Sequence, residues 1–393
     1  MLIGLVGKPS VGKSTFYKAS TLAEVEIASY PFTTIDASRG AAYVKVECAE
    51  KDFGVKCTPN KGYCIRGNRF VPIELMDVAG LVPGASEGKG LGNKFLDDLR
   101  AADCFIQIID ISGTTDIEGK PTEGHNPAED IVFLEEELNN WYKNIFMNGW
   151  RTFSRKVESQ KIKLSEAILT QFSGLKVKEY QVEEALSMTN LTEHCIEWSD
   201  EDVMLFASTL RKVSKPMIVA ANKIDVASGF ENYEKLKAEY PDLIIIPCSA
   251  DSELALRQAA KAEMIEYIPG EKDFKILKDL NEKQLEALNN IKKNVLEKYE
   301  FGTGVQEILN RAVFDLLKYL PIFPASATKM NTNGKCLQDC FLLPGGSTAL
   351  DFAFFLHTDF GNNFIKAIDA RTKMALGKDY KLKARDALEI MTR

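Results

Sequence analysis

The stretch LIGLVGKPSVGKST, residues 2–15, decides how the N-terminal part of this chain folds. Its first five residues form a short apolar run, which predicts a buried strand that ends just before Gly7. The pattern Gly-x-x-x-x-Gly-Lys-Ser that follows is typical of a phosphate-binding loop between a strand and a helix. We therefore assign nine consecutive residues to nucleotide binding: Gly7, Lys8, Pro9, Ser10, Val11, Gly12, Lys13, Ser14 and Thr15.

Each residue type in this loop has a chemical role toward a nucleotide. The glycines allow backbone N–H groups to turn toward the phosphates, and the helix that begins near Gly12 points its positive end at the same anion. The Lys13 ammonium reaches the β- and γ-phosphates, which makes it a candidate catalytic residue, and the Ser14 hydroxyl is a ligand for Mg²⁺. A glycine-rich turn without a ligand is the alternative.

A second element, IELMDVAG at residues 73–80, delivers Asp77 and Gly80 at the end of another apolar strand. We expect Asp77 to hold Mg²⁺, directly or through water, and the Gly80 N–H to contact the γ-phosphate as part of the catalytic set. Leu81 follows, where many nucleotide switches have a glutamine that orients the attacking water. Because leucine has neither donor nor acceptor, we predict hydrolysis at or below roughly 10⁻⁴–10⁻² s⁻¹.

The third element selects the base. After KPMIVAANKID, residues 215–225, the side chains of Asn222, Lys223 and Asp225 match an Asn-Lys-x-Asp box. A carboxylate accepts hydrogen bonds from both the ring N–H and the exocyclic amine of guanine, whereas adenine shows no such donor pair. The sequence therefore favours GTP and GDP over adenine nucleotides.

Residues 244–250, IIIPCSA, supply a fourth element, an apolar strand that ends in Ser249 and Ala250, where a loop N–H is placed to meet the guanine carbonyl. All four elements follow predicted strands, in the order of a doubly wound α/β fold that binds its ligand at the carboxyl ends of parallel strands. The sequence predicts a GTP-binding P-loop domain, and a purely structural doubly wound domain is the alternative.

The composition is that of a globular protein with two or three domains. The chain has 393 residues, of which 45% are apolar and 27% are charged. No apolar run approaches the roughly 18 residues of a membrane span, so we expect a cytoplasmic protein without a membrane partner. The net charge of −7 argues against a coating of nucleic acid, and we expect no DNA partner.

These motifs resemble those of the Obg-related GTPases, and among them the YchF-type branch in its archaeal-like form that keeps a guanine-specific box. The resemblance is carried by a C-terminal segment, described below, and by GKPSVGKST (7–15), YPFTT (30–34), DVAGLVPGASEGKGLGNKFLDDLRAAD (77–103) and NKID (222–225). The resemblance covers nearly the whole chain. It implies that 30–34 is the first switch and that Thr34, rather than Thr33, contacts Mg²⁺ and the γ-phosphate. From the residues alone, a surface turn before a strand is an equal alternative.

The resemblance also implies an answer to the missing glutamine. Proteins of this group have a hydrophobic residue at the position of Leu81, and something else must then place the attacking water. The candidates are a backbone group, an ion, or a residue of the glycine-rich segment GASEGKGLG, residues 84–92, once a partner orders it. Some relatives hold a catalytic K⁺ with an asparagine where this chain has the shorter Ser10, so K⁺ activation stays an open alternative here.

We divide the chain into three units. Residues 1–124 and 211–320 are predicted to form the GTP-binding domain, which a helical insertion over residues 125–210 interrupts. The amphipathic periodicity of this insertion fits a partner-binding arm and a self-packed bundle equally well. Residues 321–393 form the last unit, and their segment 340–393 resembles a TGS domain, a small ubiquitin-like α/β module of RNA-linked proteins.

The resemblance to a TGS domain implies a ribosome or RNA partner, reached through this module and the helical arm. Six basic side chains are candidates for contacts with RNA phosphates: Arg371, Lys373, Lys378, Lys381, Lys383 and Arg385. A solvated charged surface is the alternative. Residues 251–320, which precede the module, have a helical pattern.

The eight cysteines are scattered along a long chain, so we expect reduced thiols. Cys48, Cys57 and Cys64 lie between the first two nucleotide elements, and Cys336 and Cys340 lie near the last unit. Their spacings of nine, seven and four residues lack the Cys-x-x-Cys pairs of common zinc sites. We therefore expect Mg²⁺ but no zinc, and leave a disulfide as an alternative.

Several functions remain open at this point. The first is a regulatory GTPase that hydrolyses GTP to GDP and phosphate. The second is a P-loop kinase that phosphorylates a small molecule, and the Asn-Lys-x-Asp box argues against it. A nucleotide-dependent scaffold with negligible hydrolysis is suggested by Leu81, and an ATP-hydrolysing relative is the last alternative.

Overall fold

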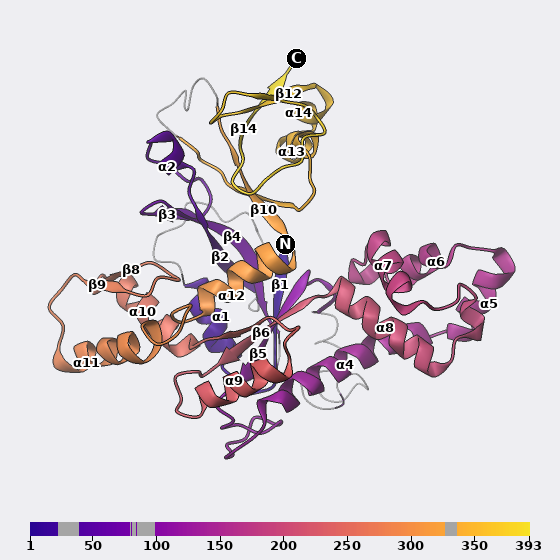
Figure 1. Ribbon diagram of the computed structural model, residues 1–393, viewed down its shortest axis with the longest axis horizontal. Helices are drawn as coiled ribbons and strands as arrows, with labels where there is room; N and C mark the ends of the chain where they lie inside the picture. The colour runs from indigo at the N-terminus through magenta and orange to yellow at the C-terminus, as the bar shows by residue number, and fades with distance from the viewer. Residues whose placement is uncertain (23–38, 79, 81–83, 85–98, 327–335) are drawn as a thin grey trace.

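A computed structural model of the protein describes residues 1–22, 39–78, 80, 84, 99–326 and 336–393 (Figure 1). A seven-stranded sheet lies at its centre, in the order β2-β4-β1-β5-β6-β7 with β3 paired to β4. Its strands are β1 (Leu2–Val6), β2 (Arg39–Glu47), β3 (Tyr63–Ile65), β4 (Asn68–Asp77), β5 (Cys104–Asp110), β6 (Met217–Asn222) and β7 (Ile245–Pro247). Strands β4, β1, β5, β6 and β7 are mutually parallel, whereas β2 and β3 run antiparallel to β4.

Strand register brings the ends of the parallel strands to one edge of the sheet. Leu5 in β1 is level with Asp77 in β4, and Asp110 in β5 is level with Asn222 in β6. The polar residues that end these strands therefore meet above a buried apolar sheet, as predicted for a doubly wound fold.

Alternation along β1 explains why helices cover both faces. Ile3 and Leu5 pack in a core with Phe16 of α1 and Val305 of α12, whereas Leu2 and Val6 pack in a second core with residues of α4. The helices of the first face are α1 (Lys13–Thr21), α10 (Ala250–Lys261) and α12 (Val305–Arg311), and those of the second face include α4 (Pro127–Met147) and α9 (Gly229–Glu239). The predicted doubly wound architecture is confirmed.

The helical insertion projects from one end of α4 and packs on itself (Figure 1). Its further helices are α5 (Trp150–Gln160), α6 (Leu164–Gln171), α7 (Glu179–Thr189) and α8 (Asp200–Ser214), with short 3₁₀ turns over Ser173–Leu175 and Cys195–Glu197. Aromatic rings fill its centre, where Phe146 contacts Trp150, Phe172 and Phe206. Asn126 caps the start of α4 by accepting a hydrogen bond from the Ala128 N–H at 3.1 Å, as the Asn-Pro signal indicates.

Residues 251–320 differ from the purely helical prediction. They contain α10, α11 (Glu282–Ile291), α12 and two short π-helical segments, Lys292–Leu296 and Ala312–Leu316, but also a hairpin of β8 (Ile265–Tyr267) and β9 (Phe274–Ile276). These three-residue strands are too short to leave a period-two pattern in the sequence. Tyr267 instead packs with Leu256 and Leu296 in a small core of its own.

The C-terminal unit is a five-stranded sheet in the order β11-β10-β14-β12-β13. Its strands are β10 (Tyr319–Pro324), β11 (Phe341–Pro344), β12 (Phe364–Asp369), β13 (Ala375–Leu376) and β14 (Ala387–Thr392), and its helices are α13 (Ala349–Leu356) and α14 (Thr358–Asn362). Thr348 and Asp351 form a capping box that starts α13. Strand β10 lies in this sheet, and the domain limits proposed above stay predictions. None of the described helices combines the length and apolar character that a bilayer crossing requires.

Candidate nucleotide site

The loop between β1 and α1 needs glycine at both of its ends. Gly7 has φ 154°, and a Cβ added there would lie 2.4 Å from the Ile108 carbonyl oxygen. Gly12 has φ 90°, and its Cβ would lie 2.3 Å from Nδ2 of Asn222. Any side chain at these positions would push the loop away from the sheet. In this loop Val11 is buried, whereas Ser10 and Ser14 are exposed.

Asp77 stands beside the start of α1. Its two carboxylate oxygens lie 3.1 Å from Nζ of Lys13 and 2.9 Å from Oγ of Ser14, which donates to it. The structure thus brings together three residues that the sequence assigned separately. A hydroxyl oxygen and a carboxylate oxygen at this distance fit the oxygen ligands that Mg²⁺ prefers, and the adjacent ammonium suits a phosphate.

Part of the predicted phosphate sensor lies in the described structure. Gly80 is exposed and lies against the loop, because a Cβ on it would be 3.3 Å from Pro9. The Gly84 N–H donates to Oε1 of Glu137 in α4 at 2.6 Å. Thr33, Thr34 and Leu81 lie outside the described residues.

Asn222 connects the phosphate-binding loop to the fourth element. Its amide Nδ2 donates to the Val11 carbonyl at 2.8 Å, and its Oδ1 accepts from the Ala250 N–H at 3.0 Å. Asn222 is buried, so both contacts are shielded from water. Asn222 of the Asn-Lys-x-Asp box therefore bonds to the protein itself and fixes the distance between two loops.

Lys223 also contacts the protein. Its ammonium lies 2.8 Å from Oδ2 of Asp110, which is fully buried at the end of β5. Burial alone would raise the pKa of Asp110, but hydrogen bonds from Lys223, Ser112 and Thr115 outweigh it and lower the pKa below its usual value. The carboxylate is therefore charged and neutralises the Lys223 ammonium. The backbone of Lys223 is left-handed, with φ 65°.

The Asp225 side chain is available to a ligand, whereas the backbone N–H groups of Ser249 and Ala250 are not. Asp225 is exposed and has no hydrogen-bond or ion-pair partner among the residues that the structure describes. In contrast, the Ser249 N–H donates to the Thr303 carbonyl at 2.9 Å, and the Ala250 N–H is taken by Asn222. In this conformation neither N–H is free to meet a guanine carbonyl, and Ser249 is buried as the N-cap of α10.

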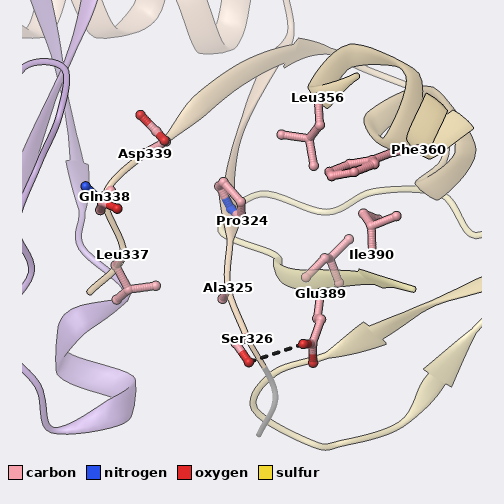
Figure 2. Close-up of a pocket in the computed structure, with 11 residues that line it drawn as sticks. Pro324, Ala325, Ser326, Leu337, Gln338, Asp339, Leu356, Phe360, Glu389 and Ile390 are labelled. Carbon is pink, nitrogen blue, oxygen red and sulfur yellow. Dashed lines mark hydrogen bonds between the residues drawn. The ribbon is translucent and has the colours of Figure 1, made fainter. Parts of the chain in front are cut away.

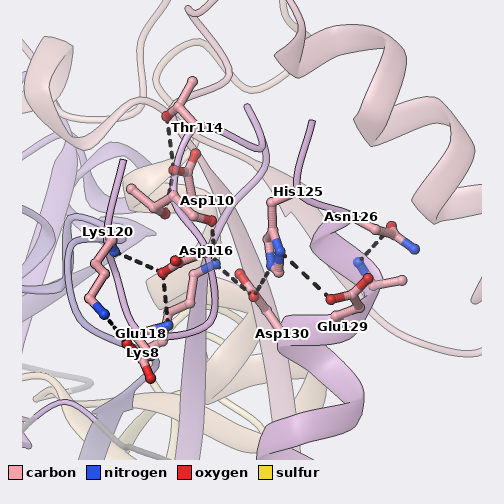
Figure 3. Close-up of polar contacts among 12 residues, drawn as sticks. Lys8, Asp110, Thr114, Asp116, Glu118, Lys120, His125, Asn126, Glu129 and Asp130 are labelled. Carbon is pink, nitrogen blue, oxygen red and sulfur yellow. Dashed lines mark hydrogen bonds and ion pairs between the residues drawn. The ribbon is translucent and has the colours of Figure 1, made fainter. Parts of the chain in front are cut away.

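Lys8 lies in the phosphate-binding loop, and its buried side chain points toward Asp130 (Figure 3). Its ammonium lies 2.8 Å from Oδ1 of Asp130 in α4 and donates to the Thr115 carbonyl at 2.8 Å. Nε2 of His125 lies 2.7 Å from the same Asp130 oxygen. Burial raises the pKa of Asp130, whereas its contacts with Lys8 and His125 act in the opposite direction. Only the backbone of Lys8 is placed to serve a nucleotide.

Sequence reasoning missed three carboxylates of this region. Asp110 ends the buried run CFIQIID as Asp77 ends its own strand, so the same signal was present. Asp130 and Glu137 lie on α4 and contact the loop and Gly84 from far along the chain. No local pattern distinguishes these two from the other acidic residues of an amphipathic helix.

Arg371 and Arg385, two of the six candidate RNA contacts, form ion pairs within the protein. Arg371 lies 2.6 Å from Asp52, and Arg385 lies 2.9 Å from Glu47. Both acidic residues belong to the N-terminal part of the chain, so these arginines hold the C-terminal unit against it. Among the remaining candidates, Lys381 donates to the Gly346 carbonyl at 2.8 Å.

A hollow of about 330 Å³ in the C-terminal unit is separate from this site (Figure 2). Leu356 and Phe360 line one side of it and Ile390 another, while the Ser326 hydroxyl donates to Glu389 at 3.2 Å. Its lining is mainly apolar and lacks the lysine and hydroxyl pair found at the phosphate-binding loop. We therefore place the candidate site at the carboxyl edge of the central sheet.

Three protein-family models match different parts of the chain. A model of the 50S ribosome-binding GTPases matches residues 2–147. The G4 motif-containing domain of Obg-like GTPases of the YGR210-like type matches residues 220–326, and a TGS domain matches residues 330–392. The predicted P-loop GTPase fold and the predicted TGS domain are confirmed.

Individual relatives match all or part of the chain. The chain is 46% identical to an uncharacterized GTP-binding protein, MJ1332, of Methanocaldococcus jannaschii over 100% of this chain and 99% of the relative. A crystal structure of a GTP binding protein from Pyrococcus horikoshii OT3 is similar with a TM-score of 0.81 at 41% identity, covering 100% of both chains. The ribosome-binding ATPase YchF of Bacillus subtilis is 28% identical over 66% of this chain and 69% of the relative.

Replacing Asn222 by alanine tests whether this side chain organises the site. Asn222→Ala leaves a buried carbonyl and a buried N–H without a partner, which should lower the free energy of unfolding by about 1–3 kcal/mol. The loosened loop should also bind GTP at least about tenfold more weakly. Urea unfolding and calorimetric titration measure both effects, with the exposed Asn289→Ala in α11 as control. Unchanged stability and affinity would remove Asn222 from the site.

Proposed function

The chain belongs to the Obg-like, YchF-type GTP-binding proteins, and we propose that it is a slow GTPase whose nucleotide state governs its contact with the ribosome or with RNA. The observation that carries this proposal is the meeting of Lys13, Ser14 and Asp77 at the loop after β1. In the form described, the Asp77 carboxylate neutralises Lys13. A nucleotide phosphate would take over the ammonium and free Asp77 for a cation.

The protein's residues have distinct roles in this proposal. The backbone of residues 7–15 binds the phosphates, and Ser14, Asp77 and Thr34 hold Mg²⁺, which neutralises phosphate charge when it is bound. Gly80 offers its N–H to the γ-phosphate from its position beside Pro9. Asn222 and Lys223 keep the loops in place through Val11 and Asp110, and Asp225 reads the base.

Asp225 supports a preference for guanine, whereas the name of one relative argues against it. Its exposed carboxylate, next to a lysine that Asp110 has already neutralised, is free to accept two hydrogen bonds from guanine. The relative with 46% identity is called a GTP-binding protein, whereas the Bacillus subtilis relative is called an ATPase. An ATP-hydrolysing protein is therefore the second candidate.

Exchanging this carboxylate for an amide discriminates between the bases. Asp225→Asn replaces one acceptor by a donor, which should weaken GTP binding by about 2–3 kcal/mol, or roughly 30- to 150-fold. The same amide should improve binding of xanthosine triphosphate, whose carbonyl stands where guanine has its amine. Calorimetry with GTP, ATP and xanthosine triphosphate measures this, with the exposed Asp242→Asn as control. An unchanged preference in Asp225→Asn would place the base elsewhere and favour ATP.

The proposed GTP hydrolysis distinguishes this function from a scaffold that binds GTP without hydrolysing it. Under single-turnover conditions with Mg²⁺, we expect phosphate release from GTP at or below roughly 10⁻⁴–10⁻² s⁻¹, because Leu81 cannot orient water. Lys13→Ala, which removes the ammonium from the phosphates, serves as the blank. Release that does not exceed this blank would establish the scaffold. A matched series with K⁺ or Na⁺ shows whether Ser10 supports activation by K⁺.

Helix α4 supports a route from the nucleotide to the helical insertion. Asp130 on its first turn holds Lys8 of the phosphate-binding loop, and Glu137 two turns later holds Gly84 of the glycine-rich segment 84–92. Phe146, near the end of the same helix, contacts Trp150 at the start of α5 in the insertion. A change at the loop or at Gly84 would therefore act directly on α4.

Sedimentation with ribosomes tests the proposed partner. We expect a larger ribosome-bound fraction with a non-hydrolysable GTP analogue than with GDP, because only the γ-phosphate engages the Gly80 loop. Lys13→Ala should lose this difference. The comparisons support this partner through the ribosome-binding GTPase family and the ribosome-binding relative, and a ribosome partner would place the protein in the cytoplasm. Equal absence from ribosomal fractions in both states would contradict the proposal.

A further inference from the structure

Four potential metal ligands that are separated in the sequence meet beyond the end of β2. Cys48 directly follows this strand, Glu50 begins the short helix α2 (Glu50–Phe53), Cys57 lies in the following loop and Cys64 lies in β3. Their three sulfur atoms and one carboxylate oxygen all lie within 4.8 Å of one another. Cys48 and Cys57 are buried, and the other two are half-buried. The expectation of no zinc relied on spacing along the chain, whereas the fold brings these side chains together.

The arrangement is close to that of a closed tetrahedral site. Ligands about 2.3 Å from a zinc ion at the corners of a tetrahedron lie about 3.8 Å apart. Sγ of Cys64 already lies 3.5 Å from Oε1 of Glu50. The other oxygen of Glu50 accepts a hydrogen bond from the Cys57 N–H at 2.8 Å, which orients the carboxylate toward the sulfurs. Shifts of about 1 Å or less would bring the four atoms into coordination distance.

Arg69 supplies an independent indication that this cluster carries negative charge. Its side chain is fully buried, and its guanidinium donates to the Leu337 and Gln338 carbonyls and lies 3.9 Å from Sγ of Cys48. Among the residues that the structure describes, its charged neighbours are cysteines and not carboxylates. Buried charges in proteins are usually paired with an opposite charge. Three thiolates and a carboxylate around a divalent ion leave a surplus of negative charge that Arg69 offsets.

We propose that Cys48, Cys57, Cys64 and Glu50 bind one zinc ion. Thiolate ligands select zinc over magnesium, and four protein ligands leave no position for a substrate, so the site is structural. It lies outside the nucleotide site and does not depend on GTP binding.

The site's position indicates what it stabilises. The Thr58 N–H donates to the Cys336 carbonyl at 2.9 Å, and the Asn60 N–H donates to the Gln338 carbonyl at 2.8 Å. Gln338 returns a side-chain hydrogen bond to Asn60 at 2.7 Å. The loop after Cys57 therefore carries the contact with the C-terminal unit. An ion that ties both ends of this loop to β2 would fix the surface on which that unit docks.

Metal analysis of the full-length protein tests the site. The chain should be purified without an affinity tag and without chelators, under reducing conditions, and analysed by mass spectrometry of the elements. We expect about one zinc ion per chain, and at least a tenfold lower content in Cys57→Ser and in Cys64→Ser. Cys195→Ser, which changes a buried cysteine of the helical insertion, should keep its zinc. Lys13→Ala should also keep it, even if GTP binding is lost.

If the cysteine variants do not fold, two other measurements test the zinc site. Cobalt exchanged into the wild-type protein should give the thiolate charge-transfer and visible bands of a tetrahedral site, and Glu50→Gln should bind zinc at least about tenfold more weakly in competition with a chromophoric chelator. In hydrogen exchange, zinc removal should lower protection at residues 57–60. Wild-type protein that contains no zinc and takes up none would overturn the site, as would a disulfide between any two of the three cysteines in the alkylated protein.

Discussion

The geometry of the candidate nucleotide site depends on the two hydrogen bonds of the Asn222 side chain. One amide spans the gap between the loop after β1 and the loop after β7, and Gly12 lies so close to it that no other residue fits. Parallel pairing brings the strand ends to one level, but it does not fix the loops that follow them. The asparagine provides this second constraint. One residue later, the ion pair of Lys223 with the buried Asp110 fixes the loop after β6 to β5.

The parts of the fold that follow from local patterns were predictable. Gly7 and Gly12 mark a turn that requires glycine, and the buried runs before Asp77 and Asn222 are short, apolar and bounded by polar residues. From these, the doubly wound sheet could be deduced, and the candidate site at its carboxyl edge stays a prediction. The C-terminal module was recognised by resemblance, and the pairing of its strands was not deduced from the residues.

The features that sequence reasoning missed all depend on contacts between distant residues. Lys8 belongs to a loop pattern, yet its ammonium is drawn inward by Asp130, more than a hundred positions away. The spacing of Cys48, Cys57 and Cys64 excluded common zinc motifs, but a strand, a turn of helix and a hairpin return these side chains to one point. The hairpin of β8 and β9 is stabilised by its packing against neighbouring helices and not by strand-forming periodicity.

The ion pairs of Arg371 and Arg385 with Asp52 and Glu47 have a consequence for recognition by polyanions. A strand of RNA that used these arginines would first have to displace carboxylates that are covalently part of the same molecule and present at high effective concentration. The intramolecular acids thus act as a built-in competitor. They would weaken non-specific binding to phosphate backbones, so that only a ligand with additional contacts elsewhere would bind. The ion pairs that hold the two units together would therefore also make the choice of ligand more selective.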